Sequence, residues 1–192
     1  MDDANELNQT IDLILSGDKQ AFGDLYEKTI QDVYRTVHFL LEEKTEVDDI
    51  VQDTYIQVYK NLKKFDKTKS FKPWITGIAI KQIQSHRRQI WKGIRILKKI
   101  EKTESFAVSD KTDELIDKFS NKKVEELVNF LPYKLKQVII LQYVNEHSQD
   151  EIAKILNIPL GTVKSRINAS LTKLRQNGYE DKLFFEKVRN VQ

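Results

Sequence analysis

The chain has 192 residues, of which 32 are Lys or Arg and 29 are Asp or Glu, giving a formal net charge of +3. It has no cysteine, which excludes disulfides, zinc–thiolate sites and cysteine nucleophiles and fits a reducing cytoplasm. With only 6 glycines and 3 prolines, the composition favours long helices. The acidic segment Met1–Glu6 lacks the basic region and apolar core of a signal peptide, so we expect a soluble cytoplasmic protein.

The charges are distributed unevenly along the chain. Acidic residues gather early, at Glu42, Glu43, Glu46, Asp48, Asp49 and Asp53. From Lys67 to Ile100 there is no acidic residue, whereas Lys and Arg recur throughout that stretch. A basic surface next to an acidic one predicts two kinds of partner, one of them polyanionic, and nucleic acid is the favoured polyanion.

Two helices are predicted in the first third of the chain. Gly17-Asp18 is typical of a helix stop followed by an N-cap, and apolar residues then recur at three- and four-residue spacing from Phe22 to Leu41. Thr45–Asp48 resembles a capping box with Asp in place of the usual Glu, which predicts the start of a second helix. The expected core stripe of that helix consists of Ile50, Val51, Thr54, Tyr55, Val58 and Leu62.

A third helix is predicted after a polar, lysine-rich loop over residues 61–69. Ser70 can cap it, because Pro73 in the first turn gives up a backbone donor that lacks a partner there anyway. Its expected buried stripe consists of Trp74, Ile75, Ile78, Ala79 and Ile83. Three such helices can share a core, so we expect residues 1–100 to form one small helical domain.

The rest of the chain predicts a linker and a second helical domain. Helical periodicity fades over residues 101–114, which we interpret as a short linker. The pattern then returns, with a break at Leu131-Pro132, and predicts a domain over residues 115–179. The tail, residues 180–192, has no assigned role. The expected fold class is therefore all-α, with two small helical domains and a helix-turn-helix in the C-terminal one.

Ser148 to Arg175 has the pattern of a helix-turn-helix. Ser148–Glu151 is a full capping box, and Asn157–Pro159 supplies a turn. The residues expected to be buried are Ile152, Ala153 and Leu156 in the first helix and Val163, Ile167, Leu171 and Leu174 in the second. The second helix is expected to expose Thr162, Lys164, Ser165, Arg166, Asn168 and Lys173. Because an α-helix fits the major groove and these side chains donate hydrogen bonds, the motif predicts binding to double-stranded DNA.

Several segments of the chain, taken together, resemble bacterial RNA polymerase sigma factors of the extracytoplasmic-function branch. Asp48–Tyr55 resembles the core-binding motif of their second region, and Ser70–Ala79 resembles the stretch that follows it. Leu131-Pro132, Val138–Leu141, Glu151–Ala153 and Gly161–Arg166 resemble their fourth region. The order and spacing of these segments agree with the family from about residue 18 to residue 175.

The resemblance implies a protein that binds core RNA polymerase, directs it to specific promoters and helps to open the DNA. Asp48, Asp49, Val51, Gln52 and Asp53 match the surface that docks on the clamp helices of the polymerase β′ subunit. The helix-turn-helix matches the reader of the upstream (−35) promoter element. The resemblance also implies contact with the polymerase β flap and with an anti-sigma factor, which in this branch is often membrane-bound.

The resemblance assigns residues 61–88 to the downstream (−10) promoter element. Lys72, Lys81, Arg87 and Arg88 are the expected DNA-binding cations there. Strand opening needs an aromatic platform for an unstacked base, with Phe65, Phe71 and Trp74 as candidates. Trp74 lies on an apolar stripe, which favours a core position for that ring.

Other classes of function find less support. His38, His86 and His147 have no metal-ligand spacing, and neither a glycine-rich phosphate loop nor a nucleophile elbow is present, so we expect neither enzymatic activity nor a cofactor. A stand-alone helix-turn-helix regulator is the main alternative, and it would bind an operator by itself, as a dimer. A helical adaptor without a DNA role is a third alternative, which predicts no salt-dependent DNA binding.

Overall fold

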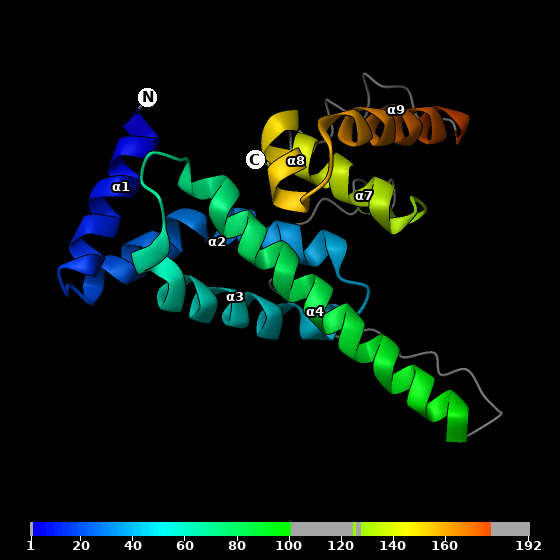
Figure 1. Ribbon diagram of the computed structural model, residues 1–192, viewed down its shortest axis with the longest axis horizontal. Coiled ribbons are helices and arrows are strands. Elements are labelled where there is room, and N and C mark those ends of the chain that lie inside the picture. The colour runs from blue at the N-terminus through cyan, green and yellow to red at the C-terminus, as the bar shows by residue number, and fades with distance from the viewer. Residues whose placement is uncertain (1, 101–124, 126–127, 178–192) are drawn as a thin grey trace.

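The computed structural model describes residues 2–100, 125 and 128–177, and Figure 1 shows that they are helical with connecting turns. The first helix group contains α1 (Asp2–Leu15), α2 (Gln20–Leu40), α3 (Val47–Asn61) and α4 (Phe71–Ile100). The second helix group contains α7 (Tyr133–Ile139), the π-helix η3 (Ile140–Val144), α8 (Gln149–Leu156) and α9 (Leu160–Gln176). The all-α class is confirmed. The predicted linker and tail lie outside the described residues. None of the described helices is long and apolar enough to cross a membrane.

The turn before α2 forms as the sequence predicts. Gly17 has a φ of +104°, a backbone conformation that suits glycine, and it follows the end of α1. Asp18 Oδ1 then accepts hydrogen bonds from the backbone N–H groups of Gln20 and Ala21, at 2.8 and 3.3 Å. These bonds satisfy two of the donors that a helix N-terminus leaves without partners, and they fix the start of α2.

The predicted capping box at Thr45–Asp48 is wrong. A 3₁₀ turn over Lys44–Glu46 precedes α3, and no side chain caps the helix. In this turn the Thr45 hydroxyl donates to Glu43 Oε1 at 3.1 Å, so it is directed away from the first turn of α3. Residues 61–69 also differ from the expected loop, because Leu62–Lys64 form another 3₁₀ turn.

The core of the first helix group follows the predicted stripes closely. All six stripe residues of α3 are at most 6% exposed. In α4, Ile75, Ala79 and Ile83 are buried, whereas Trp74 and Ile78 are only partly buried. The sequence patterns did not predict α1, which packs against α2 and adds the buried apolar side chains Leu7 and Ile11 and the buried Thr10.

The second helix group contains an unexpected π-helix. The helical spacing of apolar residues between Leu135 and Tyr143 predicts one regular α-helix. Instead, α7 ends at Ile139 and the wider turn of the π-helix η3 begins at Ile140. The N–H of Asn145 accordingly bonds to the carbonyl of Ile140, five residues back, at 3.1 Å. The wider turn places Asn145 and His147 where they face the first helix group.

The two helix groups pack together in a closed arrangement, with α8 against α4 and η3 against α2. Polar contacts of Asn145 and His147 lie in this junction. The Thr36 hydroxyl lies 2.7 Å from the Asp32 carbonyl and 3.2 Å from Asn145 Oδ1, and Asn145 Nδ2 donates to the same Asp32 carbonyl at 3.1 Å. His147 Nε2 lies 3.0 Å from the Thr76 hydroxyl. Because that hydroxyl donates to the Lys72 carbonyl, its oxygen is placed to accept a hydrogen bond from the Nε2–H group of His147.

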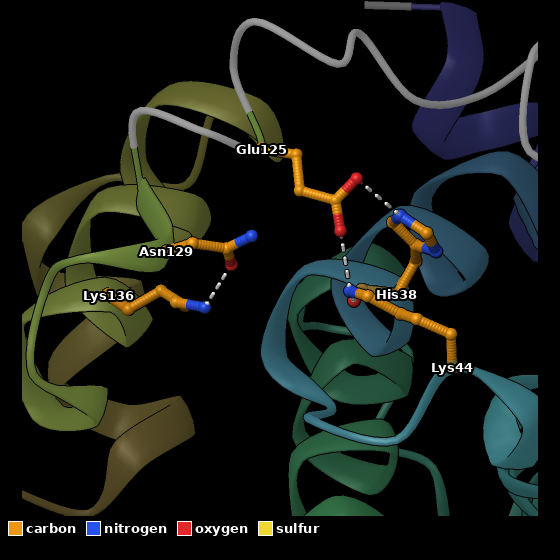
Figure 2. A network of polar contacts seen from close by, with 5 residues as sticks. All are labelled: His38, Lys44, Glu125, Asn129 and Lys136. Carbon is orange, nitrogen blue, oxygen red and sulfur yellow. Dashed lines mark hydrogen bonds and ion pairs between the residues drawn. The ribbon is translucent and has the colours of Figure 1, made fainter. Parts of the chain in front are cut away.

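Figure 2 shows a further polar contact of the junction, at Glu125. The Glu125 carboxylate lies 3.0 Å from Lys44 Nζ and 3.5 Å from His38 Nε2, the second distance being longer than a hydrogen bond. His38 and Lys44 lower the pKa of Glu125 to about 2, against the opposing effect of burial. Nearby, Lys136 Nζ donates to Asn129 Oδ1 at 2.8 Å, and burial lowers the pKa of Lys136 to about 8. The carboxylate therefore stays charged at neutral pH and attracts the Lys44 ammonium.

We expect the junction to weaken as the pH falls below about 6.5, the ordinary pKa of histidine. Burial lowers the pKa of His147, partly opposed by the Glu151 and Asp32 carboxylates and reinforced by Lys72. The neutral ring is thus favoured in the closed arrangement, and its stabilising effect is lost as the pH falls through the lowered pKa. The chain has no cysteine, so Cys residues introduced at 27 in α2 and at 173 in α9 can each carry a dye. The efficiency of energy transfer between the two dyes should fall as the pH is lowered from 8 to 5, because the helix groups move apart.

Two variants separate His147 from His86, which lies outside the junction. His147→Gln should flatten the pH dependence of the energy transfer. His86→Gln should leave it in place, because the His86 ring contacts Glu46 within the first helix group, at 3.1 Å. Energy transfer that stays constant over this pH range in the parent chain would show that the His147 contact does not control the junction.

Candidate docking groove and nucleic-acid interface

A groove of about 780 Å³ lies between α2 and α3. Its lining is mainly aromatic and aliphatic, with a few polar groups among the apolar ones. The lining residues are Phe22, Tyr26, Ile30, Tyr34, Asp48, Val51, Gln52, Tyr55, Ile56, Tyr59 and Lys60. Tyr26, Ile56 and Tyr59 are 41%, 41% and 64% exposed, so the groove presents apolar surface to solvent. An exposed apolar groove with polar groups beside it fits the apolar face of a partner helix.

Aromatic contacts across the groove hold its two helices in register. The Tyr26 and Tyr55 ring centroids lie 4.6 Å apart, and those of Phe22 and Tyr59 lie 5.3 Å apart and nearly perpendicular. The Tyr55 hydroxyl lies 2.8 Å from the Thr29 hydroxyl, within hydrogen-bond distance. Burial raises the pKa of Tyr55, so its phenol is neutral and the floor of the groove carries no charge there.

The structure brings three of the five predicted polymerase-binding residues to this groove. Asp48 and Gln52 are exposed and line it, whereas Val51 is only 5% exposed and contributes to its floor. Asp49 and Asp53 are exposed on α3 but do not line the groove. Since residues four apart share a helix face, these two carboxylates form an acidic strip on α3 beside it.

The helix-turn-helix has the predicted local structure. Ser148 Oγ accepts from the Glu151 N–H at 3.3 Å, and the Glu151 carboxylate accepts from the Ser148 N–H at 2.8 Å, which confirms the capping box. Asn157 ends α8 with a φ of +51°, and the N–H of Ile158 bonds back to the Ala153 carbonyl at 3.0 Å. This turn sets the direction of α9.

The predicted inner and outer faces of α9 are present. Val163, Ile167 and Leu174 are at most 4% exposed, and Leu171 is partly buried. The predicted DNA-binding residues all retain exposure: Lys164, Ser165, Asn168 and Lys173 are exposed, and Thr162 and Arg166 are half-buried. Because the polar face is free of carboxylates, α9 presents hydrogen-bond donors and positive charge to solvent.

The predicted DNA-binding cations of α4 fall into two sets. Lys72, Lys81 and Arg88 are exposed. Arg87 is instead engaged in the junction, with its guanidinium 3.8 Å from the ring centroid of Tyr133 and a hydrogen bond to the Glu42 carboxylate. Its side chain is only 20% exposed, so in the closed arrangement Arg87 is not available to DNA.

The candidate aromatic platforms at the start of α4 pack on one another. The ring centroids of Phe65, Phe71 and Trp74 are mutually 5.1–5.3 Å apart. Phe65 and Phe71 are 8% and 3% exposed, and Trp74 is half-buried. Phe65 and Phe71 therefore belong to the core of the first helix group, and Trp74 packs against that core with part of its ring exposed.

The chain is similar to known proteins along most of its length. Residues 25–93 match the family model described as sigma-70 region 2, and residues 121–174 match sigma-70 region 4. The chain is 28% identical to the ECF RNA polymerase sigma factor SigW of Bacillus subtilis, over 88% of this chain and 95% of that protein. It is 30% identical to the RNA polymerase sigma factor NccH of Alcaligenes xylosoxydans xylosoxydans, over 84% of this chain and 90% of that protein.

A solved structure has the same fold. The sigma factor RpoE of Bartonella quintana, in complex with the anti-sigma factor NepR, matches with a TM-score of 0.66 and 20% identity, over 81% of this chain and 94% of that one. Together with the family models and relatives, this fold identifies a transcription initiation factor. The chain belongs to the sigma-70 family, in its extracytoplasmic-function branch, and is an RNA polymerase sigma factor.

The capping box gives a direct test of how the DNA-reading motif is held. Ser148→Ala should lower the free energy of unfolding by about 1 kcal/mol, because it removes the acceptor of the Glu151 N–H bond. Urea unfolding followed by circular dichroism measures this loss. Ser165→Ala is the matched control: that hydroxyl is exposed on α9 and bonds only to the Thr162 carbonyl among its described contacts, at 3.0 Å. Equal stabilities of the two variants would contradict a capping role.

Proposed function

We propose that the α2–α3 groove and the acidic strip beside it dock on the clamp helices of the polymerase β′ subunit. The observation that carries this proposal is the exposed aromatic groove next to Asp49 and Asp53. A helix of about 10–12 Å diameter can lay an apolar face on the groove. Basic residues on that helix would then lie against the carboxylates of α3, and such complementary charge sets the orientation and rate of docking.

We propose that the two helix groups bind the two promoter elements. The exposed face of α9 takes the upstream (−35) element, with Thr162, Lys164 and Arg166 near its N-terminal end reading bases in the major groove. The cations of α4 bind the downstream (−10) element. The chain then supplies recognition and positioning, while bond formation belongs to the polymerase, in the cytoplasm where the polymerase and its template meet.

We infer that the closed arrangement differs from the promoter-bound one. The two elements are named for positions about 25 base pairs apart, which corresponds to about 85 Å of DNA at roughly 3.4 Å per base pair. In the closed arrangement α8 contacts both α4 and α9, so the axes of the two DNA-binding helices lie within roughly 16–20 Å of one another where they pack on α8. Binding of both elements therefore requires the helix groups to separate.

We also propose an anti-sigma factor as a partner of this chain, together with a contact between the second helix group and the polymerase β flap. The related RpoE was solved with its anti-sigma factor, and the present chain shares that fold. We assign residues 1–100 and 115–179 as the two functional domains, with residues 101–114 as the linker and 180–192 as a tail. The two matched family models, 25–93 and 121–174, fall within the two domains.

The polymerase surface is tested by charge reversal. Asp49→Lys with Asp53→Lys should abolish binding to core RNA polymerase and promoter-specific transcription in a reconstituted reaction, because like charges would then face the partner. The fold should persist, since both side chains are exposed. Affinity for core polymerase and the yield of run-off transcript are the measurements.

Asp24→Lys is the control for the charge reversal. Asp24 is exposed on α2 and does not line the groove, so this variant should bind polymerase and transcribe like the parent chain. A double variant that is folded and fully active would overturn the placement of the polymerase on α3.

The DNA-reading face is tested at Arg166. If this side chain contacts a base bidentately, Arg166→Ala should weaken binding to the upstream element by roughly 1–3 kcal/mol and relax the preference at one base pair. Lys173→Ala, near the other end of α9, should weaken binding to all sequences equally and lower the salt dependence, as expected of a phosphate contact. Affinities of the reconstituted holoenzyme for a set of upstream-element variants distinguish the two outcomes. A loss at Arg166 that is equal on every sequence would exclude base reading by that residue.

A further inference from the structure

Promoter opening leaves unpaired bases that need an aromatic surface to stack on. Of the three rings that the sequence suggests for this role, Phe65 and Phe71 are buried, at 8% and 3% exposed. Trp74 is partly buried and packs against both of them. The aromatic platform must therefore be sought among the exposed rings. This inference rests on the proposed function, since it concerns the downstream DNA contact of the first helix group.

Among the described residues, the aromatic side chains that are more than a third exposed are Tyr26, Tyr59, Trp91 and Phe130. Tyr26 and Tyr59 line the docking groove, which also contains a carboxylate and which we assign to the polymerase. Phe130 lies in the second helix group, next to the Leu131-Pro132 break. Trp91 differs from all three, because it lies on the basic helix α4 and is 58% exposed.

The surroundings of Trp91 suit a nucleotide. In the closed arrangement the indole borders a hollow of about 280 Å³ that is also lined by Gln84, Arg87, Arg88 and Tyr133, none of them acidic. Tyr133 belongs to the second helix group, whereas the other lining residues lie on α4 and stay together when the helix groups separate. Gln84 and Arg88 lie seven and three residues before Trp91, so the three side chains share one face of α4. This face offers an aromatic surface for a base, a guanidinium for a phosphate and an amide for a base edge.

We propose that Trp91 is the stacking platform for an unpaired base of the opened promoter, and that Arg88 binds the adjoining phosphate. The contact uses Arg88 and not Arg87, because Arg87 donates a hydrogen bond to the Glu42 carboxylate within the first helix group. The contribution of Trp91 is expected mainly where the DNA is single-stranded, because a paired base keeps both of its faces covered by its neighbours. Removal of the indole should then weaken binding to unpaired DNA by roughly 5- to 150-fold.

The first experiment uses holoenzyme assembled from core RNA polymerase and the full chain. Its affinity is measured for a promoter that is unpaired over the −10 element and for the same promoter fully paired, and opening of the paired template is followed by permanganate footprinting. Trp91→Ala should lose affinity for the unpaired template and slow the opening, whereas Trp91→Phe should keep most of both. Ile90→Ala is the matched control, because Ile90 is a neighbouring exposed apolar side chain, 43% exposed, on a different face of α4.

Three results would overturn the proposal. Trp91→Ala with parental affinity for the unpaired template excludes stacking. Equal losses on paired and unpaired templates place the indole against the polymerase or the DNA duplex. Equal losses in the Ala and Phe variants show that an aromatic ring at this position is not what matters.

The second experiment is independent of transcription. The chain has 2 tryptophans, so Trp74→Phe leaves Trp91 as the sole tryptophan. Its fluorescence should be quenched by a single-stranded oligonucleotide and much less by the duplex of the same sequence, and Arg88→Ala should weaken the quenching in a salt-dependent manner. If the holoenzyme failed to transcribe but the quenching were seen, the proposed function would fail while the stacking contact held. No quenching by single strands would overturn the stacking contact itself.

Discussion

The arrangement of the molecule depends on the polar junction between the two helix groups. Asn145 and His147 meet Thr36 and Thr76 at distances of 3.0–3.2 Å, and His147 and the two threonines are at most 6% exposed. A buried polar group without a partner costs free energy, so Asn145 and His147 favour the packing in which they are paired. The π-helix η3 makes this possible, because its wide turn brings Asn145 and His147 to the surface of α2 and α4.

The same junction divides the proposed binding surfaces into those that are accessible in the closed arrangement and those that are not. The α2–α3 groove is lined entirely by those two helices and stays open to solvent. Arg87 is engaged by Tyr133 and Glu42, and α9 is held close to α4 because both helices pack on α8. A polymerase contact is thus compatible with the closed arrangement, whereas simultaneous contact with both promoter elements is not. The junction must therefore open between the contact with the polymerase and the contact with both promoter elements.

The parts of the site that sequence reasoning predicted correctly are those set by short-range contacts. The Ser148–Glu151 capping box, the Asn157 turn and the buried face of α9 each depend on residues within about four positions of one another, and all three are present. Thr45–Asp48 shows the limit of such patterns, because the 3₁₀ turn there directs the Thr45 hydroxyl to Glu43 instead. The residue spacing of a capping box therefore does not by itself determine the backbone conformation in which the capping hydrogen bonds can form.

The all-helical class, the helix-turn-helix and the uneven distribution of acidic and basic residues follow from the amino-acid sequence alone, because helical periodicity and charge are local properties of the chain. Which aromatic rings face solvent depends instead on tertiary packing. Phe65 and Phe71 turn inward while Tyr26 and Trp91 remain exposed, although all four sit in helical or flanking segments of similar composition. The tertiary structure also decided that Arg87 contacts Tyr133, 46 residues further along. Exposure and pairing of this kind depend on how distant segments pack, and no local pattern in the sequence carries that information.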